Sequence, residues 1–413
     1  MSIRPLVPLT IAVALTMPAA ARAQYNYTPI ARTGSGSGFA GVFPPQINQV
    51  GSVAFGATLT NGGQGIFVGT QGVVVPIVQT GTTFNGFQVA PAPIVTAINP
   101  GTNTNAFFAT RTAAAGGGGG VFTSDSLTVS TIASTTPPSQ FTTFGVGVDI
   151  NAGNNVAFTA GNVTTQGVFI GAPGAPLTTV ATTGTVFTSF NAAVAINASG
   201  QTSYSAALTA AAGGGAGVFR FTPQTGGTTS IAATGAQFAG FGGPTDINDS
   251  GQVAFLAART IVAGGGFGIF RGNGVLLDTI ATTGSVFSQF GSTPSINNFG
   301  DVVFSADLTA GGQGIFNGPN AVTNKIIRTG DLLDGSTVTS VALASGAFND
   351  LGQVAFVAAL ADGRQGIYVA RPVPEPASVL LIAGTALAAG GWWRRRWQVS
   401  TSPASLGQTR ARG

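Results

Sequence analysis

The sequence contains no cysteine and no histidine, and its only glutamate is Glu375, near the C-terminus. These absences exclude disulfide bonds, thiol nucleophiles and zinc sites built on histidine or cysteine, and they remove the side chain that most often acts as a general base. A domain of this size must therefore be stabilised by burial of its core alone. Any carboxylate chemistry between residues 24 and 371 depends on aspartate.

Charge is also scarce, because Asp, Glu, Lys and Arg together make up 7% of the residues, against about 25% in an ordinary globular domain. Serine, threonine, asparagine, glutamine and glycine must then cover the surface. The formal net charge of +4 comes from the two ends, since residues 24–371 hold nine Lys and Arg against eleven Asp, a net charge of −2. No basic surface is left to neutralise phosphates, so we expect no nucleic-acid partner.

The first 23 residues are typical of a secretory signal peptide. Arg4 precedes an apolar stretch from Leu6 to Met17, and residues 21–23, Ala-Arg-Ala, form a small-residue cleavage site. The alternative is a buried N-terminal strand. We expect residues 1–23 to be a signal peptide and residues 24–371 to be the exported domain.

The C-terminal residues are typical of a membrane anchor. Residues 377–393 form an apolar run of 17 residues, followed by Arg394, Arg395 and Arg396. A helix of that length covers roughly 25 Å, enough to cross a thin bilayer. Arginines directly after the run should stay in the cytoplasm, which leaves the bulk of the chain outside. We therefore expect a transmembrane helix at 377–393 and a basic cytoplasmic tail at 394–413.

A phrase close to the form Ile-Asn-x-x-Gly-Gln-Val-Ala-Phe recurs seven times, about fifty residues apart, and its clearest copy spans residues 247–255. The copies at Asn99 and Asn197 depart from this form. A fixed period of this length indicates a repeat architecture. Asn at the first position of a β-turn can bond its own backbone, and Gly at the fourth position tolerates left-handed dihedral angles. The seven turn asparagines are Asn48, Asn99, Asn151, Asn197, Asn248, Asn297 and Asn349.

One repeat unit, residues 247–295, contains four segments that favour strands, at 253–257, 268–271, 275–282 and 286–290. Asn273-Gly274 between the second and third segments predicts a two-residue type I′ hairpin. Four short strands in about fifty residues match the size of a propeller blade.

The ends of the repeat array point to a closed ring. The last copy stops after residues 366–369 and lacks its third and fourth strands, and the segment 29–34, followed by Phe39 and Phe43, resembles that missing half. Ring closure removes both free sheet edges, whereas an open solenoid would need polar caps instead. We therefore predict an all-β fold, a seven-bladed β-propeller whose last blade is closed by N-terminal strands. A β-solenoid is the alternative.

The repeat phrase resembles that of the choice-of-anchor tandem repeat proteins defined by an NxxGxxAF motif, over nearly all of residues 24–371. The segment Val373-Pro374-Glu375-Pro376, the apolar run and the arginine cluster, in that order, resemble a PEP-CTERM sorting signal. This resemblance implies that an exosortase-type membrane protease recognises the motif at 372–376 and releases the protein from its helix. The chain continues for 17 residues past Arg396, whereas such signals usually end close to the basic cluster. An anchor that is never cleaved is the alternative.

Two aspartate-containing segments are candidate sites. Asp246, Asn248 and Ser250 place oxygen atoms as the start of an EF-hand calcium loop does, but the twelfth position is Ala257 where a bidentate Glu is required. The nearest pair of carboxylates in the sequence is Asp331 and Asp334. Because Asp-Gly at 334–335 favours a turn, we expect turn residues at both places and predict no catalytic residue, metal or cofactor.

The sequence therefore favours a non-enzymatic cell-surface or extracellular-matrix protein. We expect it to be held in the inner membrane facing the periplasm, and then to reach the cell surface or the extracellular space after sorting. Few charges and many hydroxyl and amide side chains favour contact with a neutral exopolysaccharide or a matrix protein. The competing class is a hydrolase or lyase that acts on extracellular polysaccharide through two Asp carboxyls in a central pocket. A structural spacer without a small ligand is a third possibility.

Overall fold

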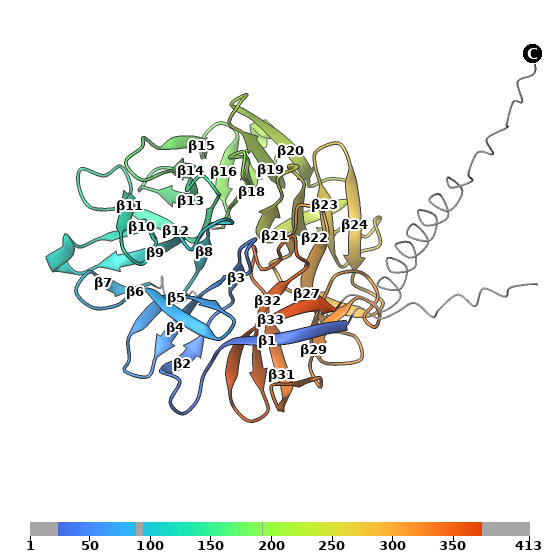
Figure 1. Ribbon diagram of the computed structural model, residues 1–413. Coiled ribbons are helices and arrows are strands. Elements are labelled where there is room, and N and C mark those ends of the chain that lie inside the picture. The colour runs from blue at the N-terminus through green and yellow to red at the C-terminus, as the bar shows by residue number, and fades with distance from the viewer. Residues whose placement is uncertain (1–23, 88–93, 192, 374–413) are drawn as a thin grey trace, which may run out of the picture. The chain divides into compact units, whose positions relative to one another are not determined.

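The protein is described here by a computed structural model that covers residues 24–87, 94–191 and 193–373. Within these residues the strands form seven antiparallel sheets arranged as a closed ring of blades around a central channel (Figure 1). Residues 25–372 form one compact unit. The predicted seven-bladed β-propeller is confirmed, and the β-solenoid alternative is wrong.

The blades are numbered 1 to 7 in chain order. Blade 1 contains β2 (Phe39–Val42), β3 (Gln46–Ile47), β4 (Val53–Leu59), β5 (Gln64–Thr70) and β6 (Val73–Gln79). Blade 2 contains β7 (Phe84–Gly86), β8 (Thr96–Ile98), β9 (Asn105–Arg111), β10 (Gly119–Ser124) and β11 (Val129–Ser134). Blade 3 contains β12 (Thr143–Ile150), β13 (Val156–Gly161), β14 (Gln166–Gly171) and β15 (Thr178–Thr182).

Blade 4 contains β16 (Phe187–Phe190), β17 (Ala195–Ile196), β18 (Thr202–Leu208), β19 (Ala216–Thr222) and β20 (Gly227–Ala233). Blade 5 contains β21 (Phe238–Ile247), β22 (Val253–Arg259), β23 (Phe267–Gly272) and β24 (Leu277–Thr282). Blade 6 contains β25 (Phe287–Phe290), β26 (Ser295–Ile296), β27 (Val302–Leu308), β28 (Gln313–Phe316) and β29 (Lys325–Arg328). Blade 7 contains β30 (Leu332–Leu333), β31 (Ser336–Ala342), β32 (Val354–Leu360), β33 (Gln365–Val373) and β1 (Gln24–Arg32).

Two short 3-10 helices, η1 (Ala113–Ala115) and η2 (Ala210–Ala212), lie between the second and third strands of blades 2 and 4. In blades 1 to 6, the first strand lines the channel and the fourth strand forms the outer edge. In blades 1, 2, 4 and 6 the first strand is interrupted and continues as a short second piece, so that β3, β8, β17 and β26 pair with the same partner as the piece before them.

The blade boundary differs from the predicted repeat unit by one strand. The segment predicted as the fourth strand of the unit, 286–290, is β25, the first strand of blade 6. The Asn-x-x-Gly phrase is therefore the turn between the first and second strands of a blade, and not the start of a blade. Sequence periodicity gives the repeat length but not its starting point, because every starting point in a circular array is equivalent.

The N-terminus closes the ring with one strand rather than with half a sheet. Strand β1 pairs with β33 at the outer edge of blade 7, whereas β2, which contains Phe39, is the first strand of blade 1. At this seam Thr33 donates its backbone N–H to the Gln365 carbonyl, and Gln365 donates its own N–H to Thr33 Oγ1, both at 2.8 Å. The predicted closure is confirmed, but the predicted number of closing strands is wrong.

The Asn273-Gly274 hairpin also differs from the prediction. Gly274 has a φ of 92°, but Asn273 does not have a positive φ, and the turn extends from Gly272 to Leu277. Asn273 Oδ1 accepts hydrogen bonds from the N–H groups of Val275 and Leu276 at 2.9 and 2.8 Å. This Asx-turn satisfies the backbone over four residues, so the tighter type I′ turn does not form.

Aromatic side chains build the interior of each blade. In blade 5, Phe238, Phe255 and Phe270 are almost fully buried, and their ring centroids lie 5.0–6.1 Å apart. A Cβ on Gly268 would lie 2.6 Å from the Phe270 ring, so this strand needs glycine two positions before its aromatic residue. Equivalent clusters occupy blades 2, 3, 4 and 6. The abundant phenylalanine therefore serves the core.

Candidate functional site

The seven repeat asparagines lie in the turns between the first and second strands, and all are buried. In blade 5, Asn248 Oδ1 accepts a hydrogen bond from the Gln252 N–H at 2.9 Å, and Gly251 has a φ of 74°. The same bond to the residue four positions later forms at Asn48, Asn151, Asn197, Asn297 and Asn349. Asn99 Oδ1 accepts instead from the N–H groups of Gly101 and Thr102.

Six of the same asparagines also connect one blade to the next, which the sequence did not indicate. Asn248 Nδ2 donates to the backbone carbonyl of Asn297 at 3.1 Å, and Asn349 Nδ2 donates to that of Asn48 at 3.0 Å across the seam. Asn99, Asn151 and Asn197 make the equivalent bond. Asn48 reaches the Thr102 carbonyl instead, at 2.9 Å. Asn297 Nδ2 instead donates to Asp301 Oδ2 of its own turn, at 3.4 Å. Six of the seven asparagines therefore make interblade hydrogen bonds around the channel.

In blades 5, 6, 7 and 1 the residues directly after these asparagines form a row of hydrogen bonds at the channel mouth. Asn298 donates its N–H and its side-chain amide to the two carboxylate oxygens of Asp350, at 2.7 and 3.0 Å. The same amide donates to Asp249 Oδ2 at 2.9 Å, and Asp350 N–H donates to Gln49 Oε1 at 2.9 Å. These side chains therefore bond the turns of neighbouring blades to one another.

A cavity of about 170 Å³ opens at this mouth and is lined by residues from every blade. Three polar side chains on its wall sit two positions before a repeat asparagine: Gln46, Asp149 and Asp246. Each accepts a backbone N–H from the following blade, from Ile98, Ile196 and Ile296 respectively. The channel wall therefore contains two carboxyl groups that are far apart in the sequence.

Burial changes the protonation of this pair. Although part of Asp149 faces the cavity, its carboxyl is enclosed by protein, and this desolvation, together with the nearby charge of Asp246, raises its pKa to about 7. Desolvation also raises the pKa of Asp246, against the opposing effect of its hydrogen bonds. Those donors are Ser295 Oγ at 2.8 Å, Ile296 N at 3.0 Å, Gly346 N at 3.2 Å and Ile247 N at 3.0 Å.

The calcium-like segment does not bring its oxygen atoms together. The Asp246 carboxylate lies on the channel wall and accepts the Ser295 hydroxyl. Asn248 Oδ1 accepts the Gln252 N–H of its own turn. Asp249 Oδ1 accepts the Ala198 N–H of the neighbouring blade at 2.9 Å. Among the residues that the structure describes, no group of three or more His, Cys, Asp or Glu side chains is placed to hold a metal ion.

Asp331 and Asp334 take part in separate ion pairs. Lys325 Nζ lies 2.8 Å from Asp331 Oδ1. Asp334 pairs with Arg32 of β1 and, at 3.0 Å, with Arg364 of blade 7. Asp334 and Gly335 have φ values of 53° and 79° and form the tight turn between β30 and β31.

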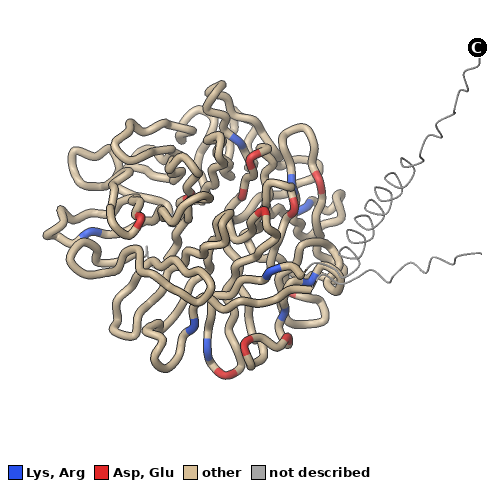
Figure 2. Tube along the Cα trace, viewed as in Figure 1, with Lys and Arg blue, Asp and Glu red and all other residues tan. Residues whose placement is uncertain are grey.

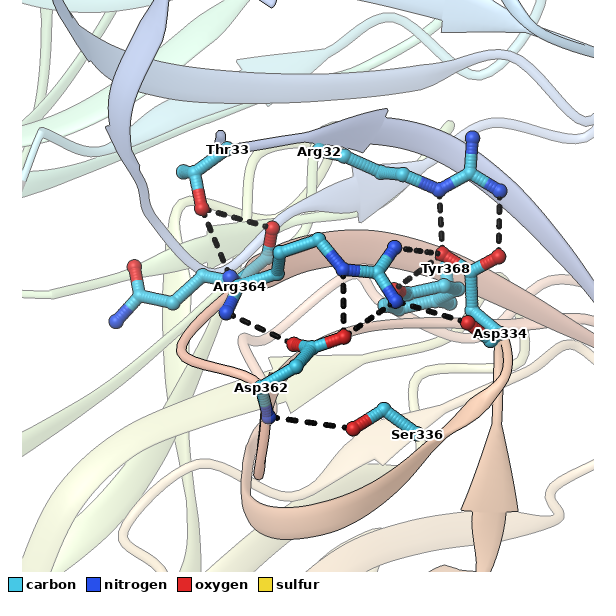
Figure 3. Close-up of polar contacts among 8 residues, drawn as sticks. Arg32, Thr33, Asp334, Ser336, Asp362, Arg364 and Tyr368 are labelled. Carbon is cyan, nitrogen blue, oxygen red and sulfur yellow. Dashed lines mark hydrogen bonds and ion pairs between the residues drawn. The ribbon is translucent and has the colours of Figure 1, made fainter. Parts of the chain in front are cut away.

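The Asp334 cluster holds the closing strand in place (Figure 3). Arg32 Nη2 donates to Asp334 Oδ1 at 2.6 Å, and the Tyr368 hydroxyl donates to Asp334 Oδ2 at 3.2 Å. Arg364 extends the network to Asp362, whose carboxylate lies 2.6 Å from Arg364 Nη2. The hydrogen bond from Arg32 is the main reason that the pKa of Asp334 lies below its usual value. Most of the charged residues lie in blades 5 to 7, and blades 1 to 4 hold few (Figure 2).

A second cavity, of about 290 Å³, opens toward the other end of the channel. Its walls are mainly apolar and include Pro44, Ile94, Val194 and Leu343. It contains no ionisable side chain among its lining residues, so hydrogen-bonding and apolar contacts are the interactions available there.

Of the predicted sorting residues, only Val373 is described by the structure; it ends β33. Pro374, Glu375, Pro376, Arg394, Arg395 and Arg396 lie outside the described residues, as do the predicted signal peptide 1–23 and the predicted helix 377–393. Within the described ranges, no helix has the length and apolar character needed to cross a bilayer.

Sequence comparison identifies two family matches. The profile described as "Family of unknown function (DUF7453)" matches residues 162–346 and 335–380, and the profile described as "PEP-CTERM protein-sorting motif" matches residues 372–396. No curated protein matches this chain. The sorting motif at the C-terminus is thus supported by an independent match, while the resemblance to the choice-of-anchor NxxGxxAF proteins stays a prediction.

Solved structures share the fold at low sequence identity. An oligogalacturonate lyase from Vibrio parahaemolyticus has a TM-score of 0.50 and 12% identity, over 86% of this chain and 99% of that one. The β-propeller domain of the trilobed protease from Pyrococcus furiosus has a TM-score of 0.49 and 9% identity, over 82% and 96%. TolB from Acinetobacter baumannii has a TM-score of 0.39 and 11% identity; 81% of this chain matches 65% of its length. At these identities the likeness concerns the fold alone.

Proposed function

We infer the function of this chain from its own residues, because it belongs to a family of unknown function, DUF7453. We propose that it is an exported, non-enzymatic propeller of the cell surface or extracellular matrix. A C-terminal membrane helix holds it in the inner membrane facing the periplasm. An exosortase-type protease then acts at the sorting motif and releases the propeller.

The observation that carries this proposal is the position of the sorting motif. Its match begins at residue 372, within β33, and β33 ends at Val373. The motif therefore follows directly on the last strand of a closed ring. A protease that cuts there would release the propeller without removing any strand except the end of β33.

The chemistry of the channel supports a non-enzymatic role. The Asp246 carboxylate already accepts four hydrogen bonds, from Ile247, Ser295, Ile296 and Gly346, and a carboxylate offers about four lone-pair sites. Three of these bonds reach Oδ2 and one reaches Oδ1, so most of the acceptor capacity of this carboxylate is used within the protein. Asp149 bonds the next blade in the same way. Both carboxyls therefore act as interblade connections, and the competing hydrolase or lyase, which requires two available carboxyls, is less well supported.

The surface supports an uncharged polymer or a matrix protein as the ligand. Charged residues make up 7% of the chain, and most phenylalanine side chains are buried inside the blades. Aromatic stacking on sugars needs exposed rings, and Phe267 and Phe299 are the phenylalanines with large exposure among the described residues. Contacts through hydroxyl and amide groups are therefore the main interactions that this surface offers to a sugar polymer.

The sorting step is tested by secretion of the full-length protein from an exosortase-containing Gram-negative host. The variant carries Pro374→Ala, Glu375→Ala and Pro376→Ala, and the control carries Pro173→Ala in an exposed turn of blade 3. We expect the wild type and the control to appear outside the cell in a shortened form, and the triple variant to stay in the membrane fraction. Equal release of all three proteins would contradict the proposal.

The non-enzymatic assignment is tested by incubating the purified protein with the exopolysaccharide of its host. We expect the polymer length to be unchanged and the polymer to be retained on immobilised protein. Depolymerisation that is lost in Asp149→Asn would establish the enzyme alternative instead.

A further inference from the structure

The two edges of the propeller disc are not equivalent. In an antiparallel blade, the turn between the first and second strands lies at the same edge as the turn between the third and fourth strands. The repeat asparagines occupy the first of these turns, and β33, as the third strand of blade 7, ends at the same edge. We call this edge of the ring the motif face. The chain therefore leaves the described propeller at the motif face.

The third position of the Asn-x-x-Gly turn changes character around the ring. It is Val50 in blade 1, Phe299 in blade 6 and Leu351 in blade 7, with exposed fractions of 65%, 75% and 57%. In blades 2 to 5 the same position holds only small residues: Gly101, Gly153, Ser199 and Ser250. Blades 6, 7 and 1 are consecutive in the closed ring. Val50, Phe299 and Leu351 thus form an exposed apolar arc that is centred on the blade from which the chain leaves.

The chain passes beside this arc as it leaves. Gly352 follows Leu351, and a Cβ on Gly352 would lie 3.1 Å from the Pro372 ring. The predicted membrane run begins at Ala377, four residues after Val373. Four Cα–Cα steps span at most about 14 Å, and the headgroup layer on each side of a bilayer is roughly 5–8 Å thick. An anchored propeller therefore has the end of β33 within about one headgroup layer of the membrane surface.

We propose that the apolar arc of Val50, Phe299 and Leu351 docks on the membrane in the anchored protein, with these side chains in the boundary between headgroups and acyl chains. The proposal rests on the proposed C-terminal anchor. Exposed apolar side chains of this size are costly in water and gain free energy at such a boundary. The neighbouring carboxylate of Asp350 already accepts two hydrogen bonds from Asn298, which reduces the cost of bringing it near lipid.

This orientation assigns different roles to the two ends of the channel. The 170 Å³ cavity, which opens among the motif turns, would face the membrane. The mainly apolar 290 Å³ cavity would face away from it. The face opposite the motif turns is then the one that can meet a matrix ligand before release.

The absence of cysteine makes the proposal directly testable, because one introduced cysteine gives one labelling site. Phe299→Cys and Leu351→Cys would be made in the full-length protein. The matched control is Ile261→Cys, since Ile261 is also apolar, is 93% exposed and lies in the loop between the second and third strands of blade 5, at the opposite edge. Each variant is labelled with an environment-sensitive dye and reconstituted in phosphatidylethanolamine and phosphatidylglycerol vesicles.

We expect the dyes at positions 299 and 351 to shift to the blue and to be quenched several-fold more by lipid-attached quenchers than the dye at position 261. Aqueous iodide should quench mainly the dye at 261. Vesicle flotation separates the two proposals. Protein that floats with vesicles but shows equal quenching at all three positions overturns the docking. Protein that does not float overturns the anchor, and with it the proposed function.

Discussion

The side-chain amide of Asn349 donates to the backbone carbonyl of Asn48, 3.0 Å away and 301 positions earlier in the chain. Both residues are almost fully buried. The bond repeats, across the seam, the connection that Asn248 makes to Asn297 inside the array. The junction that joins the two ends of the ring therefore uses the same kind of contact as four of the internal blade junctions.

Asn349→Ala should lower the free energy of unfolding. The change removes the Asn48 contact and the acceptor for the Gln353 N–H, and it leaves buried backbone groups without partners. The expected loss is on the order of 2 kcal/mol. Asn162→Ala is the control, because Asn162 makes similar turn bonds to Thr164 and Thr165 at an exposed position. Denaturant unfolding measures both, and equal losses would show that the interblade bond adds nothing.

The Arg32–Asp334 pair should control opening of the seam. Arg32 belongs to β1, whereas Asp334 belongs to blade 7, so the pair joins the closing strand to its sheet. Both side chains contact solvent, and removal of the pair by Arg32→Gln should cost less than about 1 kcal/mol in overall stability. The local effect should be larger: backbone amides of β1 should exchange hydrogen faster.

Arg271→Gln is the matched control for this prediction, because the Arg271–Asp278 pair at 2.6 Å lies within blade 5. It should leave hydrogen exchange in β1 unchanged.

The stabilising effect of the Arg32–Asp334 pair also depends on pH. Its arginine lowers the pKa of Asp334 in the folded state, so its contribution is present above the unfolded value of about 3.9 and is lost as pH falls below it. Acid should therefore remove the difference between wild type and Arg32→Gln.

The sequence predicts those features that are local or periodic. The Asn-x-x-Gly spacing gives the turn and the repeat length, and the similarity of segment 29–34 to the missing half of the last copy gives the closure of the ring. The starting point of the blade was missed because a circular repeat has no marked beginning. The wrong number of closing strands has the same cause. With the blade boundary moved by one strand, β2 belongs to blade 1, and β1 alone closes blade 7.

The contacts in the channel could not be predicted from the sequence. Asp246 bonds Gly346, which is 100 positions later and two blades away. No periodic signal marks this contact, because the equivalent positions in blades 2, 4 and 7 are the small residues Ala97, Ala195 and Ala347. The exposed residues Val50, Phe299 and Leu351 were missed for a related reason. Their pattern becomes visible only when blades 6, 7 and 1 are known to be adjacent.

Asp149 should make stability depend on pH with a sign opposite to that of Asp334. Its pKa is about 7 in the folded protein and about 3.9 in an unfolded chain. The folded state therefore holds a proton that the unfolded state has lost. The resulting contribution is complete below about pH 4 and disappears as pH rises through about 7.

Asp149→Asn should accordingly gain stability relative to wild type as pH rises. Asparagine keeps an acceptor for the Ile196 N–H but carries no charge, and between pH 5 and pH 8 we expect a relative gain on the order of 2–3 kcal/mol. Asp125→Asn is the control: Asp125 is exposed in a turn of blade 2, and its pKa is lowered by the N–H groups of Thr128 and Leu127, so the difference should be flat over this range. Denaturant midpoints at four or more pH values decide the matter. A flat difference for Asp149→Asn as well would mean that the channel carboxyl is hydrated and ionised at pH 5, and its assignment as a buried interblade connection would be wrong.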